Sequence, residues 1–178
     1  MRVMDWRMIG ASVLVAGALG GSMADAAAET RVDAKADWSV FKADNAKECW
    51  IVSAPTGWKA QRGGRDVTSS VSRGDILLMV SVRPGDSVKN EVSFTAGYPL
   101  KKDSKVSVRI GSGSFDLFTD GEWGWMSSPS EDDKVVGSMR RGAVAVLTGV
   151  SQRGTTTVDT FSLKGFSAAL DAAQDLCR

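Results

Sequence analysis

The stretch Val106–Thr119, VSVRIGSGSFDLFT, decides the fold class of this chain. Apolar residues alternate with polar ones on both sides of Gly111-Ser112-Gly113, and this period of two predicts two antiparallel strands joined by a turn. The pair Asp120-Gly121 follows at once, and such pairs are typical of tight hairpin turns. The sequence therefore predicts a meander of strands that continues through Glu122–Met126.

Segments with the same period extend the predicted sheet in both directions along the chain. Ile76–Val82 is the most apolar of them, and Pro55–Ser70 is expected to be a loop. About eight to nine short strands predict an all-β fold, either an antiparallel β-sandwich or a flattened barrel. The other expected strands are Trp38–Lys42, Cys49–Val52, Val92–Thr95, Ala143–Thr148 and Thr155–Leu163.

Two helices are expected beside the strands. Ser128-Pro129-Ser130-Glu131 combines a capping serine, a first-turn proline and a capping-box glutamate, so we expect a short helix near 129–141. Gly142 is suited to end it in a left-handed conformation. Residues at intervals of four, three and four predict an amphipathic C-terminal helix with its last member on the buried face: Phe166, Leu170, Ala173 and Cys177.

The N-terminus has the layout of a cleaved secretory signal peptide. Arg2 and Arg7 precede the apolar run Met8–Leu19, and small residues follow it. The run is shorter than the roughly 20 apolar residues that cross a bilayer. We expect cleavage after Ala24, with Ala26 as the alternative.

This cleavage divides the chain into three parts. Residues 1–24 are the expected signal peptide, residues 25–36 an alanine-rich, charged and flexible leader, and residues 37–178 a single β-rich domain. No second apolar stretch of the sequence approaches membrane length, so we expect no transmembrane segment in the mature chain. The expected localisation is periplasmic or secreted.

Export places the two cysteines in an oxidising compartment, where Cys49 and Cys177 are expected to form a disulfide bond. Such a bond would close nearly the whole domain and hold the last helix. The alternative is two free buried thiols. A catalytic thiol is disfavoured because the chain has no histidine to activate it.

Composition narrows the chemistry further. The 22 basic and 21 acidic residues nearly cancel, and no basic cluster predicts nucleic-acid binding. The absence of histidine removes Ser-His-Asp triads, imidazole bases and the common zinc sites. We therefore expect no catalytic residues, no metal and no cofactor, and hence no enzyme.

Three surface motifs have competing interpretations. Trp123 and Trp125 share one face of a strand and either pack there or form a stacking platform for a ligand. Arg73-Gly74-Asp75 spells an adhesion tripeptide, but it runs into the most apolar strand, which favours a turn. Asp116, Asp120 and Glu122 could supply paired carboxylates for glycoside hydrolysis, or they are ordinary turn acids.

With these segments identified, the chain resembles the invasion-associated locus B family of bacterial exported proteins. The resemblance covers Asp37 to Cys177, and its most specific part is Phe161–Ala169, FSLKGFSAA, which joins a strand to a helix. Many relatives carry a cysteine in the first strand where this chain has Phe41, which leaves Cys177 as the partner of Cys49. The other matching segments are Asp37–Val40, Arg73–Leu78, Glu91–Phe94, Gly97–Pro99 and Glu122–Trp125.

The resemblance implies a periplasmic or envelope protein of a Gram-negative bacterium, linked in pathogenic relatives to host-cell invasion and therefore to virulence. It brings no enzymatic activity. The expected function is a non-enzymatic interaction protein with an unknown envelope or host partner. The alternative is a periplasmic small-ligand or glycan-binding β module that uses Trp123 and Trp125.

Overall fold

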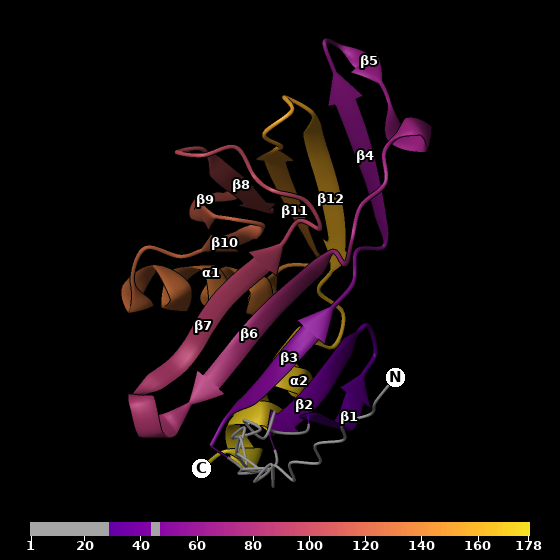
Figure 1. Cartoon of the computed structure of the whole chain (residues 1–178). Coiled ribbons are helices and arrows are strands. Elements are labelled where there is room, and N and C mark those ends of the chain that lie inside the picture. The colour runs from indigo at the N-terminus through magenta and orange to yellow at the C-terminus, as the bar shows by residue number, and fades with distance from the viewer. Residues whose placement is uncertain (1–28, 44–46) are drawn as a thin grey trace, which may run out of the picture.

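The computed structural model describes residues 29–43 and 47–178, and the strands within them form one open antiparallel sheet of twelve (Figure 1). Their order across the sheet is β1-β2-β3-β6-β7-β10-β9-β8-β11-β12-β4-β5. The strands are β1 (Glu29–Lys35), β2 (Trp38–Ala43), β3 (Cys49–Ser53), β4 (Gly57–Arg62), β5 (Arg65–Asp66), β6 (Leu77–Arg83), β7 (Val88–Thr95), β8 (Lys105–Ile110), β9 (Gly113–Asp120), β10 (Trp123–Trp125), β11 (Val144–Val150) and β12 (Thr156–Ser162).

The predicted fold class is confirmed. All nine strands expected from the sequence are present, and the sheet is open rather than closed into a barrel. Three further strands, β1, β4 and β5, raise the number to twelve. The proposed signal peptide, residues 1–24, and its cleavage sites after Ala24 or Ala26 lie outside the described residues.

The three additional strands replace two segments that were expected to be irregular. Residues 29–35, assigned above to a flexible leader, form β1 and pair with β2. Within the expected loop, β4 pairs with β12, and Gly63-Gly64 with positive φ joins β4 to β5. These strands escaped prediction because β1 and β5 are exposed along nearly their whole length, so no burial pattern marks them.

The sheet curls so that side chains of its two halves meet in one core. Figure 1 shows β2, β3, β6 and β7 in one half and β8, β11 and β12 in the other. Phe94 of β7 and Phe161 of β12 meet edge to face with ring centroids 6.2 Å apart. The indole N–H of Trp38 in β2 donates to the carbonyl of Ser162, 3.0 Å away at the end of β12.

Helix α1 (Pro129–Arg141) begins as the sequence predicts. Ser128 is its N-cap, and the Ser128 hydroxyl accepts from the Glu131 N–H at 3.4 Å. Gly142 ends the helix, but its φ of −87° is not the expected left-handed one. The position instead requires close packing, because a Cβ there would lie 2.5 Å from the Ile110 side chain.

Helix α2 (Phe166–Leu176) packs against β2 and β3 and covers the core there. Its first residue, Phe166, contacts Trp38 edge to face at 5.0 Å. The predicted disulfide is confirmed: Cys49 at the start of β3 bonds to Cys177 at the end of α2, with Cα atoms 5.9 Å apart. This bond closes a loop of 128 positions and attaches the last helix to the sheet. Neither α1 nor α2 is long and apolar enough to cross a membrane.

Candidate functional site

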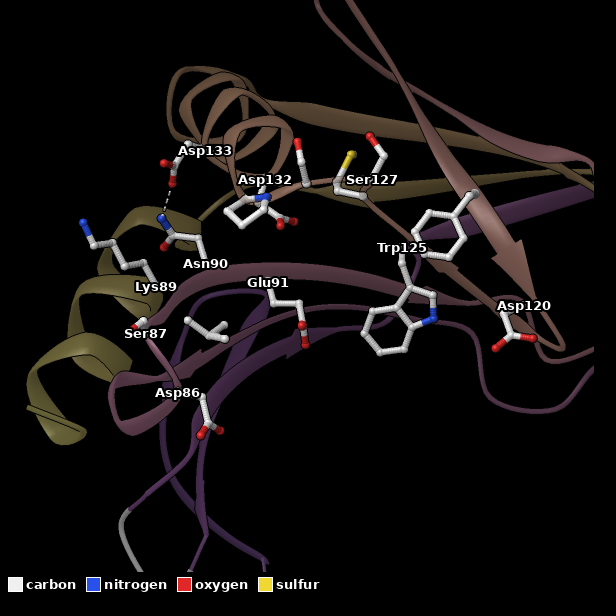
Figure 2. Close-up of a pocket in the computed structure, with 15 residues that line it drawn as sticks. Asp86, Ser87, Lys89, Asn90, Glu91, Asp120, Trp125, Ser127, Asp132 and Asp133 are labelled. Carbon is white, nitrogen blue, oxygen red and sulfur yellow. Dashed lines mark hydrogen bonds between the residues drawn. The ribbon is translucent and has the colours of Figure 1, made fainter.

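A groove of about 840 Å³ opens beside β7, at the point where the neighbouring strand β10 ends (Figure 2). β10 has only three residues and pairs with Ser93–Thr95. The chain then leaves the sheet at Met126 and enters α1. Residues 88–92 of β7 consequently have no strand neighbour on that side in the described part of the chain.

The groove is lined mainly by carboxylates and apolar side chains. Lys89 is the single basic residue of the lining, against five acidic ones. Phe118 and Trp125 supply aromatic surface, and Phe118 is 48% exposed although it is large and apolar. The groove therefore combines negative charge with exposed aromatic rings. Its acidic residues are Asp86, Glu91, Asp120, Asp132 and Asp133.

Only some of these carboxylates are neutralised by the protein itself. Arg83 pairs with Glu91 at 2.8 Å and also with Glu48 at 3.0 Å. The side-chain amide of Asn90 donates to Asp133 at 2.9 Å. The carboxylate of Asp120 has neither an ion pair nor a hydrogen bond within residues 29–43 and 47–178.

Asp132 is the buried carboxylate of the groove, with 8% of the residue exposed. Its Oδ1 accepts from the Val92 N–H at 2.8 Å and so satisfies a donor on the unpaired edge of β7. Burial raises the pKa of Asp132 to about 6, and the nearby Glu91 and Asp133 act in the same direction. The other carboxylate oxygen of Asp132, Oδ2, has no hydrogen-bond partner in the described residues. Every fully enclosed side-chain oxygen of the described residues does have a partner, so Oδ2 is accessible from the groove.

The two tryptophans lie on one face of β10, as their spacing predicts. Their rings stack with centroids 5.7 Å apart and an interplanar angle of 26°. Gly124 between them is buried against Leu117, so both indoles lie on the outer face of the sheet. Trp125 lines the groove, whereas Trp123 is 36% exposed outside it. Ligand binding by this pair remains a prediction.

The three acids considered for glycoside hydrolysis do not converge. Asp116 pairs with Lys105 at 3.0 Å, and Asp120 lines the groove. Glu122 lines a separate pocket of about 590 Å³ beside Arg73 and Tyr98. Neither of these two pockets brings the three carboxylates together.

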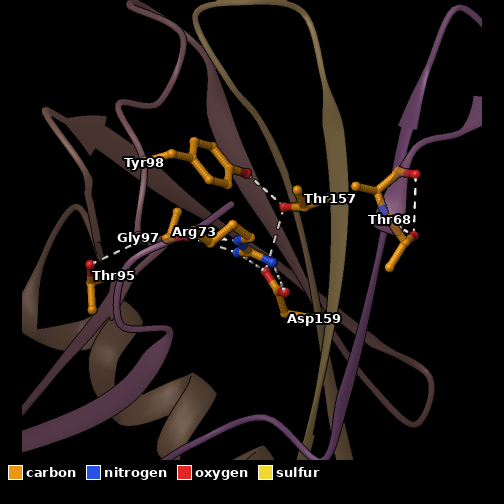
Figure 3. A network of polar contacts seen from close by, with 9 residues as sticks. Thr68, Arg73, Thr95, Gly97, Tyr98, Thr157 and Asp159 are labelled. Carbon is orange, nitrogen blue, oxygen red and sulfur yellow. Dashed lines mark hydrogen bonds and ion pairs between the residues drawn. The ribbon is translucent and has the colours of Figure 1, made fainter. Parts of the chain in front are cut away.

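Of the tripeptide Arg73-Gly74-Asp75, only the Arg73 side chain is buried, whereas Gly74 and Asp75 are exposed (Figure 3). The guanidinium of Arg73 lies between Trp58 and Tyr98, about 5 Å from each ring centroid. It forms a bidentate pair with the fully buried Asp159. The expected turn is not present, because residues 71–76 are irregular, and the Gly74 N–H donates to the carbonyl of Gly97 at 2.8 Å. The buried Arg73 side chain disfavours the adhesion interpretation.

Sequence reasoning identified Trp125 and Asp120 as candidates among the residues that line the groove, and it missed the others, including Phe118 and Asp132. Phe118 carries a recognisable signal, because it is apolar on the strand face that also carries Asp116 and Asp120. Asp132 has no such signal, since an acidic residue in the first turn of a helix is ordinary. Its burial depends on β7, which lies 40 positions away. No group of three or more Cys, Asp or Glu side chains in the described residues is arranged to hold a metal ion.

Comparison with known proteins gives two matches. The family model described as "Invasion associated locus B (IalB) protein" matches residues 38–174. The crystal structure of invasion associated protein B from Bartonella henselae is similar, with a TM-score of 0.57 and 16% sequence identity over 81% of this chain and 96% of that chain. At this identity the likeness shows the fold alone. No curated protein matches the chain significantly.

Proposed function

The chain belongs to the invasion associated locus B (IalB) family, and we propose from this membership that it is an exported envelope protein that works by binding a partner rather than by catalysis. The partner is a protein of the bacterial envelope or of a host cell. The name of the family and of the Bartonella henselae protein supports a role in host-cell invasion. Such a role makes the chain a virulence-associated protein.

Export is supported by two independent features. The first is the N-terminal pattern of basic, apolar and small residues, which is typical of a secretory signal peptide. The second is the Cys49–Cys177 disulfide, because such bonds persist in oxidising compartments. The proposed localisation is therefore the periplasm or the exterior of a Gram-negative cell.

The single observation that favours binding is the groove beside β7. It presents exposed aromatic side chains and unneutralised carboxylates without an arrangement suited to catalysis. Exposed apolar surface bordered by polar residues is typical of interaction sites. The absence of histidine and the separation of Asp116, Asp120 and Glu122 support a non-enzymatic role.

A second candidate is a periplasmic module that binds a small ligand or a glycan. The stacked, outward-facing rings of Trp123 and Trp125 favour it, because sugar rings stack on such surfaces. Titration with envelope glycans separates the two candidates. A shift in tryptophan fluorescence that is lost in Trp123→Ala would favour the glycan-binding module.

Cell fractionation followed by photo-crosslinking tests the main proposal. The tagged protein should be found in the periplasm or the medium, with its disulfide formed. A photoreactive amino acid at position 118, inside the groove, should yield a crosslinked partner in intact cells. The same amino acid at exposed position 171 on α2 is the control and should not. Retention of the protein in the cytoplasm would contradict the proposal. So would the absence of a crosslink from position 118 and from the other exposed positions on the outer face of β9 and β10.

A further inference from the structure

We propose that the groove beside β7 binds an extended segment of a partner protein that carries lysine or arginine side chains. This inference rests on the proposed function and deepens it, because it names the chemistry of the partner. Three separate features of the groove support it: its charge, its aromatic surface and the open edge of β7.

Charge selects a cationic ligand. The lining holds five carboxylates and one ammonium group, and the nearby Arg83 pairs with two of the five, Glu91 at 2.8 Å and Asp86 at 3.8 Å. Asp120 has no partner in the described residues, and Oδ2 of the buried Asp132 is open to the groove. An anionic ligand would be repelled here, whereas an ammonium or guanidinium group can form a charge-assisted hydrogen bond with either carboxylate, and two successive cationic side chains could engage one each.

The aromatic surface suits the same ligand. Trp125 of β10 is directly opposite Phe118 of β9 in the strand register, so their side chains share one face. In the view of Figure 2, the indole of Trp125 lies between the carboxyl groups of Asp132 and Asp120. A cation held by these carboxylates would therefore lie near aromatic faces, which attract it further, and the side-chain stems of lysine and arginine can pack on the rings.

The open edge of β7 favours a peptide over a small amine. Residues 88–92 have no strand neighbour on the groove side, because β10 ends at Trp125. The N–H of Val92 is already bonded to Asp132, so the free part of the edge is residues 88–91, and four residues of strand span about 14 Å. Peptides commonly bind by lying along such a free strand edge, where main-chain hydrogen bonds supplement side-chain recognition.

A synthetic nine-residue peptide in which lysine alternates with valine provides the probe. Binding to the disulfide-intact protein is measured by calorimetry, and the contact region is located from amide and indole N–H resonances. We expect saturable binding that weakens with added salt, with shifts at residues 88–92 and at the indole of Trp125. A peptide with glutamate in place of lysine should not bind. Lysine amide, which supplies the cation alone, should bind at least tenfold more weakly.

Charge-removing variants locate the site. Asp120→Asn removes an exposed charge, and Asp132→Asn keeps an oxygen that can accept from the Val92 N–H. Each should weaken binding of the lysine peptide severalfold, and the double variant at least tenfold. Asp116→Asn is the matched control, because Asp116 is on the same strand and face but pairs with Lys105 outside the groove. Its affinity should be that of the wild type.

Three results would overturn the inference: no binding of the lysine peptide, equal binding by the folded double variant, or tight binding of lysine amide alone. Photo-crosslinking in cells separates this failure from failure of the proposed function. If the double variant captures the same partner as the wild type, the groove is not the docking site although the protein still has a binding function. If neither captures a partner, the proposed function itself fails.

Discussion

Arg73 and Asp159 form an ion pair in the interior of the protein, with 3% and 0% of their side chains exposed. They are 86 positions apart in the chain, and one of their two contacts measures 2.9 Å. Arg73 also donates to the carbonyl oxygen of Ala96 and lies between the rings of Trp58 and Tyr98. This single side chain thus joins the segment before β6 to β12 and β4.

We predict that Arg73→Ala lowers the free energy of unfolding by about 3–5 kcal/mol, because Asp159 would be left buried without its counter-ion. Urea unfolding measures this change. Arg140→Ala, which breaks the exposed pair with Asp171, is the control and should change stability by less than about 1 kcal/mol. The double variant Arg73→Met with Asp159→Leu should recover part of the loss. Equal effects of Arg73→Ala and Arg140→Ala would refute the assigned role.

The disulfide should be a major contributor to stability. Replacing Cys49 and Cys177 with serine should destabilise the protein by about 4–5 kcal/mol in the chain-entropy model, because a loop of 128 positions is no longer closed in the unfolded chain. Calorimetric melting of the protein with and without reductant gives the same comparison. Hydrogen exchange should increase first in α2, which the bond attaches to β3. An unchanged melting temperature after complete reduction would contradict this prediction.

Gly97 is required by a close approach of two main-chain segments. Its φ is +68°, and a Cβ there would lie 2.6 Å from the carbonyl oxygen of Gly74. Gly97→Ala should therefore cost about 3 kcal/mol or more, since both backbone strain and a steric clash oppose it. Gly121→Ala is the matched control: φ is +58° there, but nothing lies within 4 Å of the added carbon. It should cost only about 1–2 kcal/mol of strain, and similar melting temperatures for the two variants would argue against the clash.

Asp132 should make stability depend on pH. Its pKa is about 6 in the folded protein, above the ordinary value of 3.8. Between about pH 4 and pH 6 the folded chain retains a proton that the unfolded chain has released, so this group lowers stability as pH rises through that window. Asp132→Asn should raise the free energy of unfolding at pH 7 by up to about 3 kcal/mol, with a higher melting temperature, and have little effect at pH 4.

The control for this pH dependence is Asp133→Asn. Asp133 is the exposed neighbour of Asp132 in α1, and its charge is only a minor cause of the raised pKa of Asp132, so Asp133→Asn should keep most of the pH dependence. Melting curves of both variants are compared from pH 4 to pH 8. If Asp132→Asn and the wild type have parallel stability profiles across this range, Asp132 does not titrate as described.

Sequence periodicity determined most of the sheet. Alternation in Val106–Ile110 places every second side chain in the core, and the same period in Phe115–Thr119 buries Leu117, so the sequence displays this burial directly as a local pattern. The helix cap at Ser128 is likewise a local feature, and the two cysteines can be counted directly in the sequence. The predictions of α1 and of the disulfide followed from them, and the prediction of α2 followed from the helical spacing of its apolar residues.

Only the tertiary structure decided the exposed strands and the groove. β1 and β5 bury little, so they are held mainly by main-chain pairing with β2 and β4 and show no pattern of burial in the sequence. The groove exists because β10 ends after three residues and the chain turns into α1, which brings Asp132 to the free edge of β7. Burial of that carboxyl group is a contact between distant segments, and the local pattern of apolar and polar residues carries no information about it.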